Sequence, residues 1–196
     1  MDSRRQVSGV VLAAGRSTRM GRDKALLEVD GIPLWQRQRN VLANSGVTEI
    51  FLSARSDQVW ARAATGFAAV IHDRIPGCGP IIGITAGIER ATHPLLAVLA
   101  VDLPAMTPLW FQSLLDDCTD ETGAIGRRGA FFEPLAAIYP RRFRWLLWEA
   151  VARAEYALQQ VIRKAIDEGV LRVRDIGANE ETLFANWNEP IDDRRT

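Results

Sequence analysis

The sequence predicts one α/β domain with a mostly parallel sheet and helices on both faces. Short apolar runs rich in β-branched residues alternate along the chain with amphipathic segments, which is the pattern of successive β-α-β units. The chain has 196 residues and 47% hydrophobic content, enough for one substantial core and short for two domains. We therefore expect a single Rossmann-like domain over residues 1–196.

The first half of the chain shows the alternation most regularly. Val7–Ala14 has the character of a buried parallel strand and is bounded by Gly15. A helix is expected to open at Pro33 and to end at Gly46, because proline favours the first helical turn and glycine the position just past the end. The further elements expected in this half are a strand at Glu49–Ala54, a helix at Gln58–Ala64, a strand at Ala68–His72, a helix at Ile81–Ala91 and a strand at Leu95–Val101.

The pattern is less regular from Pro108 onward. A helix is predicted to about Asp117, followed by shorter strands between Gly123 and Tyr139. The last expected elements are helices at Trp145–Ala152 and Leu158–Ile166, a strand at Val170–Val173 and a loop around Asn186.

The overall charge excludes several classes of partner. The 24 basic and 24 acidic residues cancel, so no global field attracts nucleic acid or an anionic membrane, and an anionic ligand needs a local cluster. No apolar run approaches the ~20 residues that span a bilayer, and the N-terminus lacks the pattern of a signal peptide. Cys78, Cys118, His72 and His93 show no metal-binding spacing. We predict a cytoplasmic protein without a transition-metal site.

The segment LAAGRSTRMGRDK, residues 12–24, carries the strongest chemical signal. It follows a predicted strand, which places it at the carboxyl edge of the sheet, where open α/β folds bind ligands. Gly15 and Gly21 allow a close backbone approach, while Arg19 and Lys24 supply positive charge for phosphates. The spacing matches neither a P-loop nor the dinucleotide-binding glycine pattern.

Two aspartates follow predicted strands directly. Asp102 ends the apolar run Leu95–Val101, and a carboxylate there is suited to hold Mg²⁺ against a triphosphate. Asp73 ends the strand before it in the chain. On the residues alone, both positions are also compatible with a turn or a helix cap.

The pattern LAAG-x3-RMG-x-DK resembles the signature of the MobA-type nucleotidyltransferases. Further blocks occur in the order of that family and cover nearly the whole chain. They are LLEVDGIPLWQ at 26–36, GPIIG at 79–83, Asp102-Leu103-Pro104 and NWNEP at 186–190. The resemblance implies a nucleotide-binding half at 1–107 and an acceptor-binding half at 108–196.

The resemblance also implies roles for individual residues. The catalytic residues would be Arg19, Lys24 and Asp102. The nucleotide-binding residues would be Leu12, Ala13, Ala14, Gly15, Lys24, Ser53, Asp73 and Asp102, with Asp102 as the metal ligand. The acceptor-binding residues would be Gly79, Pro80, Pro134, Asn186 and Asn188.

The reaction implied by the resemblance transfers GMP from GTP to molybdenum-molybdopterin and releases pyrophosphate. A phosphate monoester has a second pKa of about 6, so the acceptor is already ionised at neutral pH and needs no general base. Alignment and charge neutralisation remain, and Mg²⁺ on Asp102 with Arg19 and Lys24 supplies them. The same resemblance is compatible with transient contact with proteins that deliver or receive the cofactor.

Ala14 departs from the guanylyl pattern, which reads LAGG, and matches the cytidylyl branch. Ser53 likewise stands where guanylyl enzymes often carry asparagine. The GPIIG block and Glu133-Pro134-Leu135 resemble the guanylyl branch, and this resemblance favours GTP over CTP. Three alternatives stay open: CTP as the donor, a sugar phosphate as the acceptor, and a non-catalytic nucleotide-binding regulator.

Overall fold

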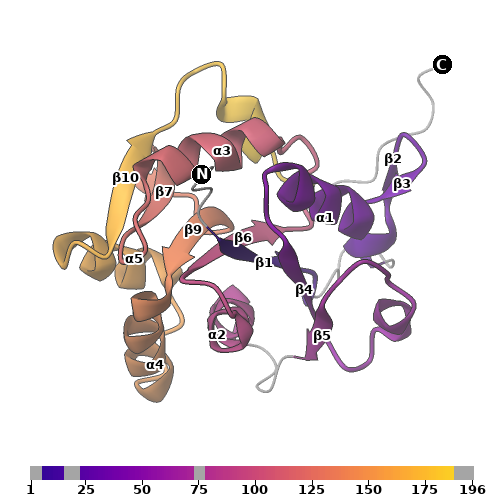
Figure 1. The fold of residues 1–196 in the computed structure, drawn as a ribbon, viewed down its shortest axis with the longest axis horizontal. Helices are drawn as coiled ribbons and strands as arrows, with labels where there is room; N and C mark the ends of the chain where they lie inside the picture. The colour runs from indigo at the N-terminus through magenta and orange to yellow at the C-terminus, as the bar shows by residue number, and fades with distance from the viewer. Residues whose placement is uncertain (1–5, 16–22, 73–77, 188–196) are drawn as a thin grey trace.

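The centre of the molecule is a parallel sheet, as the sequence predicts. The computed structural model describes residues 6–15, 23–72 and 78–187. Strand β1 (Val7–Leu12) lies between β4 (Glu49–Ala54) and β6 (Leu95–Ala100) and pairs with both in parallel, and β5 (Ala69–His72) extends the sheet beyond β4. The three inner strands therefore end at one edge of the sheet (Figure 1).

The second half of the chain extends the same sheet with mixed pairing. Strand β9 (Ala136–Pro140) is antiparallel to both β6 and β7 (Gly123–Arg128), and β10 (Leu171–Asp175) runs parallel to β7. The short strand β8 (Phe131–Phe132) pairs with β7, and the main order is β10-β7-β9-β6-β1-β4-β5. Because one sheet runs through both halves, they share a continuous scaffold.

Helices cover both faces of this sheet (Figure 1). Helices α1 (Leu34–Asn44) and α3 (Pro108–Asp117) pack on one face. Helices α2 (Pro80–Arg90), α4 (Arg144–Ala152) and α5 (Leu158–Asp167) pack on the other. Successive residues of β6 enter opposite cores: Leu95 and Leu99 face α1 and α3, whereas Leu96 and Val98 face α2 and α4. The unbroken apolar run of β6 follows from burial on both sides.

Several local elements differ from the sequence-based expectations. The predicted strand Val7–Ala14 ends at Leu12. The expected helix at Gln58–Ala64 is only a 3₁₀ turn, η2 (Val59–Arg62). At the entry to this turn, the Gln58 side chain accepts a hydrogen bond from the backbone N–H of Arg55.

A small hairpin occupies a segment in which no strand was expected. Strands β2 (Glu28–Val29) and β3 (Ile32–Pro33) pair antiparallel, and Asp30-Gly31 forms the turn with φ of 53° and 73°. Asp-Gly is a preferred pair for a two-residue turn with positive φ. The remaining short turns are 3₁₀ elements: η1 (Lys24–Leu26), η3 (Arg141–Phe143) and η4 (Glu181–Phe184).

The helices are short compared with the span of a bilayer. The longest in the described part of the chain, α1 and α2, have 11 residues each. None of the helices within 6–15, 23–72 and 78–187 combines the length and apolarity that crossing a membrane requires.

We expect Gly123→Ala to lower the free energy of unfolding by about 1–3 kcal/mol. A Cβ at Gly123 would overlap the carbonyl oxygen of Ile138, so β9 would have to move away from β7. Urea denaturation measures the change. Thr122→Ala is the control, because Thr122 precedes this contact and is partly exposed. Equal stability of the two variants would contradict the close strand approach.

Candidate active site

A cavity of about 610 Å³ opens at the carboxyl ends of β1, β4 and β6, beside the N-terminus of α2. Nine residues assigned from the sequence line it: Leu12, Ala13, Ala14, Gly15, Lys24, Ser53, Gly79, Pro80 and Asp102. Further lining residues are Asp23, Arg55, Ser56, Asp57, Gly83, Ala100, Val101 and Leu135. The parallel strands thus bring together residues from separated blocks of the sequence, at the edge where such folds bind ligands.

Lys24 and Asp102 meet in this cavity. The Lys24 Nζ lies 3.7 Å from the Asp102 Oδ2, and their side chains are 20% and 28% exposed. Lys24 begins the turn η1, which Asp23 caps by accepting a hydrogen bond from the Ala25 N–H. A cation and a carboxylate from opposite ends of the first half therefore form one partly buried polar centre.

Backbone contacts fix the segment that carries Asp102. The Val101 N–H donates to the Leu12 carbonyl, and the Trp187 N–H donates to the Asp102 carbonyl at 3.0 Å. From α1, Gln38 Nε2 donates to the Leu103 carbonyl at 2.6 Å and Arg37 Nε to the Pro104 carbonyl at 2.7 Å. The sequence pattern did not identify these supports, which hold the carboxylate at the pocket wall.

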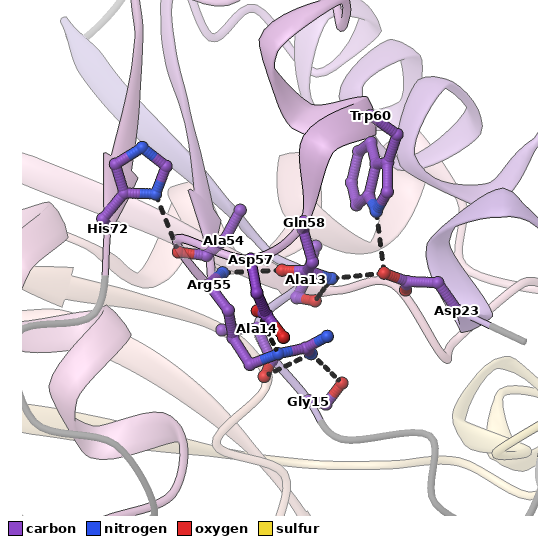
Figure 2. A network of polar contacts seen from close by, with 10 residues as sticks. All are labelled: Ala13, Ala14, Gly15, Asp23, Ala54, Arg55, Asp57, Gln58, Trp60 and His72. Carbon is purple, nitrogen blue, oxygen red and sulfur yellow. Dashed lines mark hydrogen bonds and ion pairs between the residues drawn. The ribbon is translucent and has the colours of Figure 1, made fainter.

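A second polar network, unforeseen from the sequence, joins the loop after β1 to the segment after β4 (Figure 2). Arg55 Nη1 donates to the carbonyl oxygens of Ala14 and Gly15, at 3.1 and 2.8 Å. Gln58 Nε2 donates to the Ala13 carbonyl at 2.9 Å and to Asp23 Oδ2 at 2.5 Å. Arg55 and Asp23 also line the pocket, so the network borders the ligand space.

The N-terminus of α2 forms the opposite wall. Gly79 precedes the helix with φ 74° and ψ −168°, a conformation that a residue with a Cβ rarely adopts, and Pro80 opens the first turn. The partial positive charge of a helix N-terminus favours anions. Gly83, one turn later, faces the sheet: a Cβ there would lie 2.8 Å from Ser53 Oγ and from Leu12 Cδ2.

The charged residues of the described lining are two cations, Lys24 and Arg55, and three carboxylates, Asp23, Asp57 and Asp102. Lys24 faces Asp102, and Arg55 Nε lies 3.0 Å from Asp57 Oδ1. Outside the lining, burial raises the pKa of Glu133, and Arg128, 3.0 Å away, opposes that rise. The cavity thus carries its cations already paired with carboxylates, and the helix N-terminus adds positive potential.

Some of the residues assigned from the sequence lie away from the cavity lining. The Pro134 carbonyl accepts a hydrogen bond from the Tyr139 hydroxyl, and only its neighbour Leu135 reaches the cavity. Asn186 is exposed, although the next residue, Trp187, bonds the backbone of Asp102. The remaining assigned residues, Arg19, Asp73 and Asn188, lie outside the described residues.

The donor set suits a metal that is shared with a substrate. Within the described residues, no group of three or more His, Cys, Asp or Glu side chains could enclose an ion. Mg²⁺ commonly binds through one or two carboxylates and takes its other ligands from phosphates and water. Asp102, partly exposed at the pocket wall, fits that mode.

Fold, pocket and polar centre together define an α/β nucleotidyltransferase. The chain belongs to the MobA-like NTP transferase family, whose model matches residues 9–171. Over 189 residues it is 36% identical to the probable molybdenum cofactor guanylyltransferase of Opitutus terrae, covering 95% of this chain and 92% of that protein. The resemblance inferred from the sequence motifs is confirmed.

Solved structures share the fold. Molybdopterin-guanine dinucleotide biosynthesis protein A from Archaeoglobus fulgidus aligns over 93% of each chain, with a TM-score of 0.73 and 20% identity. Rv0371c from Mycobacterium tuberculosis, in a complex with manganese, aligns over 87% of each chain, with a TM-score of 0.61 and 20% identity. These likenesses confirm the predicted α/β sheet.

We expect Gly83→Ala to weaken nucleotide binding on the order of tenfold, because the added Cβ would displace the side chains of Ser53 and Leu12, which line the pocket. Gly87→Ala is the matched control on the same helix. Its Cβ would meet Leu96 Cδ2 at 3.0 Å and Val10 Cγ1 at 3.2 Å, within the core. Calorimetric titration and thermal melting separate the two effects. Similar affinities for both variants would contradict this placement of the nucleotide.

Proposed function

We propose that this protein acts in the cytoplasm, where it transfers GMP from GTP to molybdenum-molybdopterin and releases pyrophosphate. The observation that carries the proposal is the convergence of the loop 12–15, Lys24 and Asp102 on one pocket. The relative from Opitutus terrae, named as a probable molybdenum cofactor guanylyltransferase, supports the choice of substrates because the likeness spans 95% of this chain.

The chemistry needs alignment more than proton transfer. An oxygen of the acceptor's terminal phosphate attacks the α-phosphorus of GTP. The bond from the α-phosphorus to the oxygen that it shares with the β-phosphorus breaks, and that oxygen leaves as part of pyrophosphate. The acceptor oxygen is already ionised at neutral pH. Lys24 neutralises charge on the triphosphate, and we assign the same task to Arg19 in the adjoining segment. The pocket walls hold the two substrates in contact.

Mg²⁺ is the proposed cofactor, with Asp102 as its protein ligand. When bound, the metal would neutralise charge on the triphosphate and polarise the reacting phosphorus. The likeness to Rv0371c, solved in a complex with manganese, supports a divalent ion. Ser53 and Asp73 complete the proposed nucleotide contacts.

We place the acceptor in the half formed by residues 108–196. From the first half of the chain, Gly79 and Pro80 at the N-terminus of α2 also line the pocket. Leu135 brings the segment with Pro134 to its rim. The hydrogen bond from the Trp187 N–H to the Asp102 carbonyl supports a role for Asn186 and Asn188, which flank Trp187. Proteins that deliver or receive the cofactor would approach from this side.

The proposal is tested by binding and by turnover. Titrations with GTP, CTP, ATP and UTP in the presence of Mg²⁺ identify the base, and pyrophosphate release with the molybdenum-loaded acceptor tests the transfer. Preference for GTP with acceptor-dependent pyrophosphate release is the expected result. CTP is the second candidate, because Ala14 matches the cytidylyl pattern. Nucleotide binding without pyrophosphate release would point to a regulator.

Ala14→Gly should change the ratio of GTP to CTP affinity more than it changes stability. Ala14 lines the pocket, and removal of its methyl group alters the space beside the nucleotide while the loop keeps its carbonyl contact to Arg55. Competition binding and melting temperature measure the two effects. An unchanged ratio would remove Ala14 as the explanation for base preference.

Asp102→Asn should lower kcat and kcat/KM together by roughly a hundredfold or more, because the variant loses the charge that holds the metal. The melting temperature should barely change: the lost ion pair with Lys24 is partly exposed, and such pairs contribute about 0–1 kcal/mol. If Asp102 serves only as a turn residue, asparagine will substitute well and turnover will survive.

Lys24→Ala is the companion variant for the Asp102 experiment. It removes phosphate-directed charge and leaves the metal ligand in place, so its main effect should be a higher KM for the triphosphate. Matching kinetic defects in the two variants would contradict these separate roles.

A further inference from the structure

Three successive backbone carbonyls after β1 accept hydrogen bonds from the segment after β4. Gln58 Nε2 donates to the Ala13 oxygen, and Arg55 Nη1 donates to the oxygens of Ala14 and Gly15 (Figure 2). We call the pair Arg55 and Gln58 the clasp. Because Arg55 and Gln58 follow β4, the strand that pairs with β1, the clasp ties the loop to the sheet.

The donors of the clasp are themselves held in place. Gln58 is 4% exposed, and its Oε1 accepts from the Arg55 N–H at 2.6 Å. The Arg55 side chain is 25% exposed, and its Nε donates to Asp57 Oδ1 at 3.0 Å. Two donor nitrogens of the guanidinium are therefore engaged by protein oxygens, which favours a positioning role over a direct contact with the ligand.

The orientation of the carbonyls decides where the amides point. In a planar trans peptide the C=O and N–H groups point in opposite directions. With the Ala13 and Ala14 oxygens turned toward the clasp, the N–H groups of Ala14 and Gly15 are directed away from it. The same contacts turn the three carbonyl oxygens, which would repel an anion, toward the clasp. Backbone N–H groups that face into a pocket form a binding site for anions.

The clasp also reaches the lysine at the other end of the signature segment. The Gln58 amide that holds Ala13 donates to Asp23 Oδ2, and Trp60 Nε1 donates to the same oxygen at 2.7 Å (Figure 2). Asp23 directly precedes Lys24 and caps its turn. One segment, Arg55 to Trp60, thus sets the spacing between the loop amides and the lysine.

We infer that Arg55 and Gln58 are positioning residues for the nucleotide. They present the amides of Ala14 and Gly15 to its phosphates and hold them in register with Lys24 before the nucleotide binds. This inference rests on the proposed function insofar as the ligand of the pocket is a nucleoside triphosphate. The clasp does not itself touch the reacting atoms.

The test uses Arg55→Ala, Arg55→Lys and Gln58→Glu, with Arg39→Ala as the matched control. Arg39 also donates from its Nε to a loop carbonyl, that of Gly66 at 2.8 Å, and it does not line the cavity. Calorimetry gives the affinities for GMP, GDP and GTP. The ¹H–¹⁵N resonances of Ala14 and Gly15 in the nucleotide-free protein report whether the amides are arranged in advance.

Arg55→Ala should weaken GTP binding by about tenfold or more, since a charged donor to two carbonyls is lost. The Ala14 and Gly15 resonances should shift or broaden in the free protein. Arg55→Lys retains the charge without the guanidinium geometry, so it should not restore the affinity. Gln58→Glu, which lacks the donor, should move the same resonances. Arg39→Ala should change only the melting temperature.

Two results would overturn the inference. Unchanged GTP affinity in Arg55→Ala would remove any role in binding. Weaker affinity with unmoved Ala14 and Gly15 resonances, or full recovery in Arg55→Lys, would instead indicate a direct charge contact. Failure of the proposed function can be told apart from failure of this inference. It appears in the nucleotide titrations of the unaltered protein as a preference for another base. The same variants are then compared with the mono-, di- and triphosphates of that base.

Discussion

The structure depends on one strand pairing: β1 lies between β4 and β6 in parallel and is buried along its whole length. A strand with neighbours on both sides and cores on both faces has its backbone polar groups satisfied. Apart from Ser8, whose hydroxyl donates to Glu49, β1 presents apolar side chains or glycine. The polar groups of the site therefore lie at the carboxyl ends of the inner strands and in the segments that follow them. Because the three strands are parallel, their exits meet at one edge, and residues 12–15, Ser53 and Asp102 line one cavity there.

The packing that builds the core also shapes the pocket. Gly83 and Gly87 let α2 approach the sheet until a Cβ at either position would press on side chains below. At Gly87 that contact lies within the core, and at Gly83 it lies at the floor of the cavity. Helix α2 therefore packs closely on the core near Gly87, and its N-terminal end, which includes Gly83, lines the ligand cavity.

The polar groups around the cavity are prearranged. Lys24 is held near Asp102, Arg55 bonds Asp57, and the carboxylate of Asp23 accepts from three donors. Such contacts reduce the reorganisation required when an anionic ligand and a metal arrive. The arrangement agrees with a reaction in which both substrates carry phosphates and no side chain needs to abstract a proton.

The sequence by itself determined the fold class, the family and most of the lining of the pocket, because these depend on local signals. Apolar runs marked the inner strands, glycine and proline marked the ends of α1 and α2, and the signature segment supplied residues 12–15 and Lys24. Only the tertiary structure decided the antiparallel placement of β9 and the shortening of the expected helix at Gln58–Ala64. It alone also revealed the contacts of Arg55 and Gln58 with the loop after β1. The pairing of β9 with β6 and the contacts of Arg55 and Gln58 with the loop after β1 join segments about forty residues apart. No spacing within a motif can express such contacts.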